Sequence, residues 1–365
     1  MKFQTDKNLL LKGVHIVQNI VSTKNILPIL SNILLETKRD KLILTTVDID
    51  TGIAIQSTIP VSTQEEGSIT IPAKKFFEII KELPTSTISV NIKKNNMIII
   101  DCEKCQFKLL GIPKDEFPKT PDFSKKEYIT IKQDRLKHIL NLTSFAMSED
   151  ETRYILNGVL FDIKEDKLKL VSTDGRRLAI VEEDMKIPKT LIKQLIVPKK
   201  TIQELSRILA NEGDVKILLG ENQLAFDLDD TLITTRLIEG EFPNYEQVIP
   251  KEEKQRLKVN KEKLISAIKR MSLYITPDSL CVRFDLFKDK LILSKNTQDL
   301  GEAKEELDIS YNEKELTIGF NPLLILDALK VLSGEEVVIE ILDFERPAVI
   351  RGLKYVYIVL PMHIT

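Results

Sequence analysis

Apolar and polar residues follow two different periods along the chain, and these predict short helices set between runs of strands. Leu10, Val14, Val17 and Val21 recur at helical spacing and predict a helix over 6–22. Stretches such as KLILTTV and FKLLGI alternate instead, which is typical of half-buried strands. The same reasoning predicts further helices over 72–83, 133–147, 198–210, 260–275 and 321–332.

These elements recur in three similar segments. Each segment predicts a strand, a charged turn and a second strand that begins near a leucine, and those leucines are Leu42, Leu168 and Leu291. They are spaced 126 and 123 residues apart, about a third of the 365-residue chain. A period this long indicates repeated domains, because solenoid units are only about 20–50 residues long. The three segments are 32–50, 157–175 and 281–299.

The repeat predicts an α+β fold made of three tandem copies of one domain. Each copy has about two helices and six to eight strands. The charged stretches at 123–128 and 250–258 are natural linkers between the copies. We therefore expect domains over 1–123, 124–252 and 253–365.

Composition adds little by itself. The chain has 53 Lys and Arg against 55 Asp and Glu, a net charge of −2, so total charge does not indicate a nucleic-acid partner. Three cysteines exclude a disulfide scaffold. We find neither the apolar core of a signal peptide nor a run of about 20 apolar residues, and we expect a cytoplasmic protein without membrane contact.

The distribution of charge is more informative than its sum. The six predicted helices carry +8 together, which leaves −10 for the rest of the chain. One interpretation is that Lys and Arg simply favour solvated helix faces. The other is that six equivalent basic faces line one surface that contacts a polyanion without reading its sequence.

The sequence contains little that indicates catalysis. Phosphate-loop and dinucleotide motifs are missing, and Cys102-x-x-Cys105 lacks the second pair of a zinc site. Asp48 and Asp174 occupy the same repeat position, so turn preference explains them better than metal binding, and 227–230 also reads as a turn. We expect no catalytic residue, no metal and no cofactor.

Several separate blocks resemble one family. The chain is similar throughout to the bacterial sliding clamps, the β subunits (processivity factors) of DNA polymerase III. The resemblance rests on LPILSNILLE (27–36), TRYILNGVLFDI (152–163), STDGRRLAIV (172–181), EGEFPNYEQVIP (239–250) and IVLPMHIT (358–365).

The resemblance implies a head-to-tail homodimer that closes into a ring of six like domains, with helices inside and sheets outside. Such a ring encircles double-stranded DNA independently of sequence and tethers the replicative DNA polymerase without doing chemistry itself. Other implied partners are the clamp loader and further clamp-binding-motif proteins of replication and repair. Two rival hypotheses are a repeat-built enzyme that uses the acidic turns on phosphorylated substrates, and a three-domain adaptor without a DNA function.

The resemblance also implies residues that contact DNA. Lys24 and Tyr154 correspond to positions in contacting loops, although Ile155 follows the tyrosine where many relatives have a second aromatic residue. The candidates on inner helices are Lys74, Lys75, Lys199 and Lys200.

The family's peptide-binding pocket and dimer seam can be carried over in the same way. Arg176 and His363 stand where many relatives have His and Arg. The implied seam residues are Phe107 in domain one and Met271 and Leu273 in domain three. The implied pocket residues are Leu156, Thr173, Gly175, Arg176, Arg177, Leu178, Pro243, Val248, Asn321, Leu324, Pro347, Ile358, Leu360, Pro361 and Met362. Because chain ends are normally frayed and polar, the apolar end IVLPMHIT is expected to dock and help to form the pocket.

Overall fold

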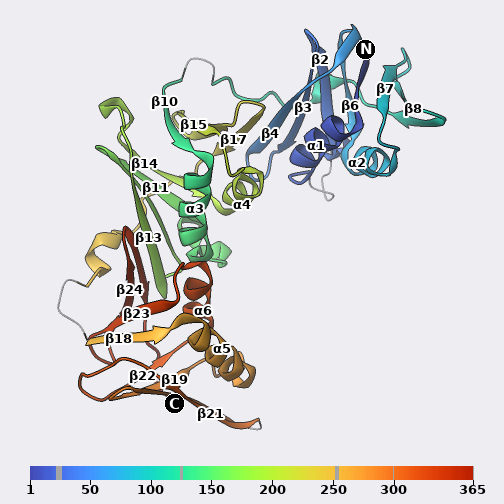
Figure 1. The fold of residues 1–365 in the computed structure, drawn as a ribbon. Coiled ribbons are helices and arrows are strands. Elements are labelled where there is room, and N and C mark those ends of the chain that lie inside the picture. The colour runs from blue at the N-terminus through green and yellow to red at the C-terminus, as the bar shows by residue number, and fades with distance from the viewer. Residues whose placement is uncertain (22–26, 124–125, 251–254, 299, 365) are drawn as a thin grey trace. The chain divides into compact units, whose positions relative to one another are not determined.

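A computed structural model describes residues 1–21, 27–123, 126–250, 255–298 and 300–364, and it contains the predicted elements three times (Figure 1). The first repeat consists of β1 (Lys2–Asp6), α1 (Lys7–Gln18), β2 (Asn32–Lys38), β3 (Lys41–Asp48), β4 (Ile53–Pro60), β5 (Ser62–Glu65), β6 (Gly67–Pro72), α2 (Ala73–Glu82), β7 (Thr87–Ile92), β8 (Met97–Cys102) and β9 (Cys105–Leu110).

The second and third repeats follow the same order but have no counterpart of β5. The second consists of β10 (Tyr128–Lys132), α3 (Gln133–Thr143), β11 (Gly158–Lys164), β12 (Lys167–Thr173), β13 (Arg177–Asp184), β14 (Lys193–Pro198), α4 (Lys199–Ile208), β15 (Asp214–Leu219), β16 (Gln223–Asp227) and β17 (Thr231–Arg236). The third consists of β18 (Gln255–Asn260), α5 (Lys261–Met271), β19 (Val282–Phe287), β20 (Lys290–Thr297), β21 (Gly301–Asp308), β22 (Leu316–Phe320), α6 (Pro322–Val331), β23 (Glu336–Ile341), β24 (Ala348–Gly352) and β25 (Tyr355–Val359).

The three tandem α+β copies are thus confirmed, and all six helices lie where the periodicity places them. The predicted helices were too long at their C-terminal ends. After α3 and α5 the chain tightens into 3₁₀ turns at Ser144–Ala146 and Ser272–Tyr274, where apolar spacing alone cannot mark the end of the α-helix.

The charged turns are tight hairpins in all three repeats. Asp40, Asp166 and Asp289 sit at the same position of these turns with φ of 57°, 55° and 55°. Aspartate tolerates this left-handed conformation better than most residues do, because its short side chain can bond locally. The repeated Asp-Lys signal therefore reflects turn geometry.

The chain forms two compact units, and their division passes through the second repeat. The first unit contains 1–136 and 200–237, and the second contains 137–199 and 238–365. The domain boundaries expected near 123 and 252 stay a prediction.

Each unit contains one large and one small sheet. In the first unit the orders are β10-β15-β16-β17-β4-β3-β2-β6 and β5-β1-β7-β8-β9. In the second unit they are β14-β11-β12-β13-β25-β24-β23-β18 and β21-β20-β19-β22.

Each large sheet joins half-sheets from two successive repeats. In the first unit β17 pairs antiparallel with β4, and in the second unit β25 pairs in the same way with β13. The small sheets contain the two remaining half-sheets, which end at the edge strands β9 and β21. The chain therefore has two internal joints and two half-sheets without a joint.

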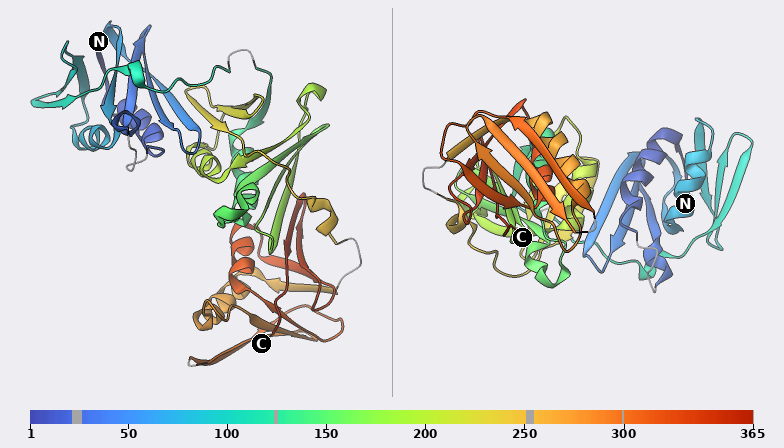
Figure 2. Two further views of the ribbon diagram at one scale, coloured as in Figure 1. Left: turned by 180° about the vertical axis from the view of Figure 1, so that it is seen from behind. Right: turned by 90° about the horizontal axis from the view of Figure 1, so that it is seen from below.

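Paired helices cover the sheets with their apolar faces. In the first unit α1 and α2 lie side by side, and in the second unit α5 and α6 do (Figures 1 and 2). Leu10, Val14 and Val17 of α1 are buried, and Val21, the last residue of that predicted stripe, is half-buried.

Two adjacent threonines on β3 provide a test of this packing. Thr46 is buried and donates from Oγ1 to the Val17 carbonyl at the end of α1 at 2.7 Å. Thr45 is also buried, but its Oγ1 has no hydrogen-bond partner in the described part of the chain. We predict that Thr46→Val lowers the free energy of unfolding by about 1–2 kcal/mol, because the carbonyl loses its donor.

Thr45→Val is the matched control for that measurement. It should leave the stability unchanged or raise it, because it removes a buried hydroxyl without a partner. Urea unfolding followed by circular dichroism compares the two variants. Equal losses of stability in both variants would show that the hydrogen bond from Thr46 to the end of α1 does not stabilise the fold.

Candidate functional sites

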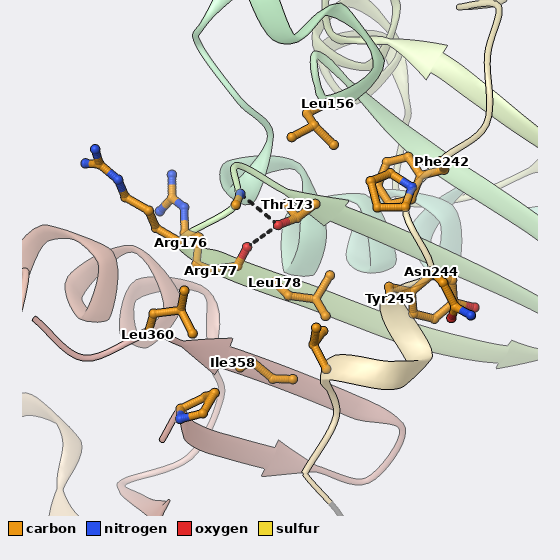
Figure 3. A pocket seen from close by; sticks show the side chains of 14 residues that line it. Leu156, Thr173, Arg176, Arg177, Leu178, Phe242, Asn244, Tyr245, Ile358 and Leu360 are labelled. Carbon is orange, nitrogen blue, oxygen red and sulfur yellow. Dashed lines mark hydrogen bonds between the residues drawn. The ribbon is translucent and has the colours of Figure 1, made fainter. Parts of the chain in front are cut away.

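A cavity of about 210 Å³ opens in the second unit beside the β12–β13 hairpin, the end of β25 and the segment 242–248 (Figure 3). Most of its lining is apolar, and only one edge carries guanidinium groups. The lining residues are Leu156, Thr173, Gly175, Arg176, Arg177, Leu178, Phe242, Pro243, Asn244, Tyr245, Val248, Pro347, Ile358 and Leu360. This arrangement can hold an apolar side chain, and its residues offer no nucleophile with an adjacent base.

The tight turn at 174–176 forms one edge of the pocket. Asp174 Oδ1 accepts the N–H groups of Arg176 and Arg177 at 2.8 and 3.0 Å, and Gly175 adopts a φ of 86°. Thr173 Oγ1 donates to the Arg177 carbonyl at 2.5 Å and accepts the Gly175 N–H at 3.0 Å. The interpretation of Asp174 as a turn residue agrees with this geometry.

Arg177 is fixed behind that edge. Its Nε donates to Asp174 at 3.0 Å and its Nη1 to Asp327 of α6 at 2.8 Å, and the guanidinium lies 5.4 Å from the centre of the Phe145 ring. Burial by itself would lower the pKa of Arg177, but the hydrogen bond to Asp327 and the nearby Tyr357 and Asp174 raise it. Of the two adjacent arginines, only Arg176 is exposed.

The chain end docks as expected and divides between two cavities. The Leu360 N–H donates to the Arg176 carbonyl at 2.9 Å, which brings Leu360 to the pocket. The Met362 N–H donates to Gly319 at 2.8 Å, and Pro361 and Met362 line a neighbouring cavity with Phe344.

Four residues expected in the pocket do not line it. Pro361 and Met362 belong to the neighbouring cavity. Asn321 caps α6 by accepting the Leu323 N–H, and Leu324 offers its carbonyl to the Tyr357 hydroxyl at 2.7 Å. Both of these residues therefore support the α6 side of the site.

Three lining residues were missed by the sequence reasoning. Phe242, Asn244 and Tyr245 stand opposite Ile358 and Leu360 in the pocket (Figure 3). The block EGEFPNYEQVIP contains all three, although the resemblance implies only Pro243 and Val248 from it. Phe242 and Tyr245 are buried in the apolar cluster beneath the pocket.

The candidate DNA contacts differ in their surroundings. Lys24 lies outside the described residues. Tyr154 is exposed in a 3₁₀ turn, Glu151–Leu156, and Lys74 is exposed on α2. Lys75 forms an ion pair with Glu78 at 2.8 Å, and Lys199 forms one with Glu149.

Lys200 is also engaged within the chain. It contacts the carboxylate of Asp48, which is almost completely buried at the end of β3. Burial tends to raise the pKa of Asp48, but hydrogen bonds from Lys200 and Thr51 lower it overall. Asp48 also accepts the N–H of Asp50 at 3.1 Å, so the turn interpretation agrees with the structure.

The expected seam residues lie near the two edge strands, with one correction. Phe107 is partly exposed on β9, and Leu273 is 77% exposed. Met271 is buried inside the third repeat, so its side chain offers no surface to a partner. Leu273 follows it in the 3₁₀ turn and has the exposure that a seam needs.

The described residues contain neither a metal-binding cluster nor a membrane-spanning helix. No cluster of three or more His, Cys, Asp and Glu side chains there could hold a metal ion. Cys102 and Cys105 are direct partners across the β8–β9 turn. No helix in the described ranges is long and apolar enough to cross a membrane.

The fold and these sites define a repeat-built assembly and binding protein. Family models of the DNA polymerase III beta subunit match its N-terminal domain at residues 1–121, its central domain at 130–244 and its C-terminal domain at 246–363. The chain therefore belongs to the DNA polymerase III beta subunit family. This is a family of processivity factors and not of catalytic enzymes.

Relatives match over the whole length. The beta sliding clamp of Chlamydia pneumoniae is 32% identical over 365 residues, covering 100% of this chain and 99% of the relative. That of Bacillus subtilis is 33% identical and covers 96% of each chain.

Solved structures agree with the fold. The DNA polymerase sliding clamp from Bacillus subtilis has a TM-score of 0.95 at 32% identity over 100% of both chains. The sliding clamp from Pseudomonas aeruginosa bound to griselimycin has a TM-score of 0.95 at 31% identity with the same coverage.

Proposed function

We propose that two copies of this chain close into a ring through β9 and β21, that the ring slides along duplex DNA, and that the pocket tethers its partners. The observation that carries this proposal is the pair of half-sheets without a joint. β9 occupies the place of β17 and β25, and β21 occupies the place of β4 and β13. An unpaired edge strand is an aggregation liability unless something covers it.

The internal joints predict the register of the seam. Phe107, Ile233 and Tyr357 are equivalent. In the preceding strands their partners occupy one repeat position, and these partners are Ile100, Phe226 and Ile350. Ile233 faces Ile55 and Tyr357 faces Ala179 at the two joints. Ile55 and Ala179 each pair with the residue four positions after the repeat leucine of the preceding strand, Leu42 or Leu168. The same count from Leu291 gives Ala303 on β21. Phe107 should therefore face the partner subunit's Ala303.

One step along the strand, this register brings opposite charges together. Lys108 follows Phe107 on β9, and Glu302 precedes Ala303 on β21, so Lys108 faces the partner subunit's Glu302. Both side chains are exposed in the isolated chain. Opposite charges directly across an antiparallel pair stabilise it.

The second joint also predicts an apolar contact at the seam. There the Phe145 and Tyr357 rings lie 5.6 Å apart. Leu273 is the counterpart of Phe145, since each is the middle residue of the 3₁₀ turn after the first helix of its repeat. Phe107 should therefore pack on the partner subunit's Leu273, which would cover that exposed leucine.

For the DNA surface we propose the exposed helix cations, with Lys24 and Tyr154 as loop contacts. Lys74, Lys263 and Lys269 are exposed and have no ion pair in the part of the chain that the structure describes. Phosphate contacts of this kind carry no sequence information, so they allow sliding. Lys75, Lys199 and Lys200 would contribute only after leaving their carboxylate partners.

For the pocket we propose short peptides with an aliphatic or aromatic end, carried by the replicative DNA polymerase, the clamp loader and other replication and repair proteins. Its apolar lining suits such an end. We place the protein in the cytoplasm, where these partners and the chromosome are.

The ring predicts topological retention on DNA. The protein, loaded by a bacterial clamp loader onto a nicked circular plasmid, should stay bound during gel filtration in moderate salt. After the plasmid is linearised it should be lost, because weak phosphate contacts cannot hold it at a free end. Equal retention on circle and line would exclude encirclement.

The seam register predicts a charge-swap experiment. Lys108→Glu should weaken dimerisation roughly 10-fold, because like charges then oppose each other at both seams. Adding Glu302→Lys should restore the wild-type dissociation constant, measured by sedimentation equilibrium. Lys38→Glu makes the same charge change at the exposed end of β2, a strand that is already paired on both sides, and should have no effect. Failure of the double variant to recover would refute this register.

The pocket predicts a loss of peptide binding in Val248→Glu. Val248 is 52% exposed and lines the pocket, so the new carboxylate would have to be desolvated when an apolar peptide end enters. We expect affinity for a fluorescent peptide with an apolar end to fall at least about 10-fold. Leu353→Glu, at a 95% exposed hairpin tip outside the pocket, is the control. Unchanged binding in Val248→Glu would place the peptide site elsewhere.

A further inference from the structure

One wall of the pocket is a segment without regular strands, residues 242–248, which we call the wall segment. Its only regular element is the 3₁₀ turn Tyr245–Val248. It contributes Phe242, Pro243, Asn244, Tyr245 and Val248 to the lining. The width of the pocket therefore depends on what holds this segment.

A buried carboxylate holds the middle of the wall segment. The Tyr245 hydroxyl donates to Asp162 Oδ2 at 2.7 Å, and Asp162, on β11, is only 1% exposed. Gln194 donates to the other oxygen of Asp162 at 3.1 Å, and the Lys164 ammonium lies 3.1 Å from Oδ2. Burial and the bond to Asp162 raise the pKa of Tyr245, so the phenol remains a neutral donor.

A second contact strengthens the same attachment. Lys164 also pairs with Glu246 of the wall segment at 3.0 Å, and Lys169 lies 3.7 Å from that carboxylate. Lys164 thus bridges the buried Asp162 and the wall segment. The apolar side of Tyr245 meanwhile packs in the cluster beneath the pocket.

The burial of Asp162 carries a free-energy cost, and stability alone does not explain why a carboxylate stands there. Burying a carboxylate carries a desolvation penalty, and well-packed apolar residues at such positions are often as stable or more stable. The first repeat uses the same strand position in a similar way, because Glu36 on β2 pairs at 3.1 Å with Lys114, in the segment that follows β9. Glu36 is more exposed, however, and residues 111–127 of that segment include no tyrosine.

We propose that Asp162 is a positioning residue of the pocket, which fixes Tyr245 and thereby the distance between the wall segment and the opposite side at Ile358 and Leu360. This rests on the proposed peptide-binding function of the pocket. Asp162 does not line the pocket itself and acts through Tyr245. It would therefore influence which apolar ends fit, as well as how tightly they bind.

The test compares Tyr245→Phe with Tyr311→Phe. Tyr311 is a buried tyrosine of the same unit whose hydroxyl bonds to Gln255 and the Lys314 carbonyl, outside the pocket. Two labelled peptides that differ only in a terminal leucine or phenylalanine are titrated by fluorescence polarisation. We expect Tyr245→Phe to bind roughly 5-fold more weakly and to change the ratio of the two affinities, and Tyr311→Phe to change neither.

A third variant tests the link to Asp162. Asp162→Asn keeps an acceptor for the hydroxyl but loses the charge facing Lys164, so it should weaken binding by less than Tyr245→Phe. Combined with Tyr245→Phe it should add little, because both act through one bond. Melting temperatures of all variants identify any general loss of folding.

The outcomes separate this inference from the proposed function. Wild-type affinity and an unchanged leucine-to-phenylalanine ratio in Tyr245→Phe would overturn the positioning role while leaving the pocket as the peptide site. Equal losses in Tyr245→Phe and Tyr311→Phe would also overturn it, because they would show general destabilisation. If the wild-type protein bound neither peptide, the proposed function of the pocket would fail first.

Discussion

The pairing of strand edges is the constraint on which the rest of this structure depends. A half-sheet exposes backbone N–H and C=O groups along its edge, and these need partners or water. The chain pairs β17 with β4 and β25 with β13, which makes three repeats continuous through two joints. The same pairing pattern leaves β9 and β21 as edge strands without a partner. In the proposed dimer a second copy would satisfy both edges at once, and a head-to-tail contact that closes would give a ring and not a filament.

The two joints differ in the cavity that lies beside each of them. Glu-Phe-Pro follows the last strand of the first and second repeats, at 116–118 and at 241–243, and the chain there runs beside a joint. At the first joint Phe123 is 5% exposed and packs on Leu218 and Ala225, and the cavity that it lines also has polar walls, among them Gln56, Asp227 and Asp229. At the second joint the equivalent residue is Val248, which is smaller and half-exposed. The apolar surface beneath it stays open to a partner, although both joints share one fold.

Sequence reasoning was strongest where one physical rule acts locally. Helix positions followed from apolar spacing, and the hairpins followed from Asp-Lys turns at a fixed interval. The pocket was predicted less completely, since its residues come from segments far apart in the chain and were placed by resemblance alone. The resemblance placed Asn321 and Leu324 in the pocket, but Asn321 caps α6 and the Leu324 carbonyl accepts the Tyr357 hydroxyl. Met271 follows Leu264 and Ile268 at helical spacing on α5, so its burial agrees with periodicity, and only the resemblance placed it at the seam.

The net charge of the helices does not show how many of their cations are free to contact DNA. The helices carry an excess of cations, but several of these are held by carboxylates: Lys75 by Glu78, Lys199 by Glu149 and Lys200 by Asp48. Each of these ion pairs must break before its lysine can contact a phosphate. Because the strength and the salt dependence of DNA binding grow with the number of phosphates neutralised, fewer free cations mean weaker contact. A ring that is held by its topology needs no strong contact, and weak contact is what allows it to move along DNA.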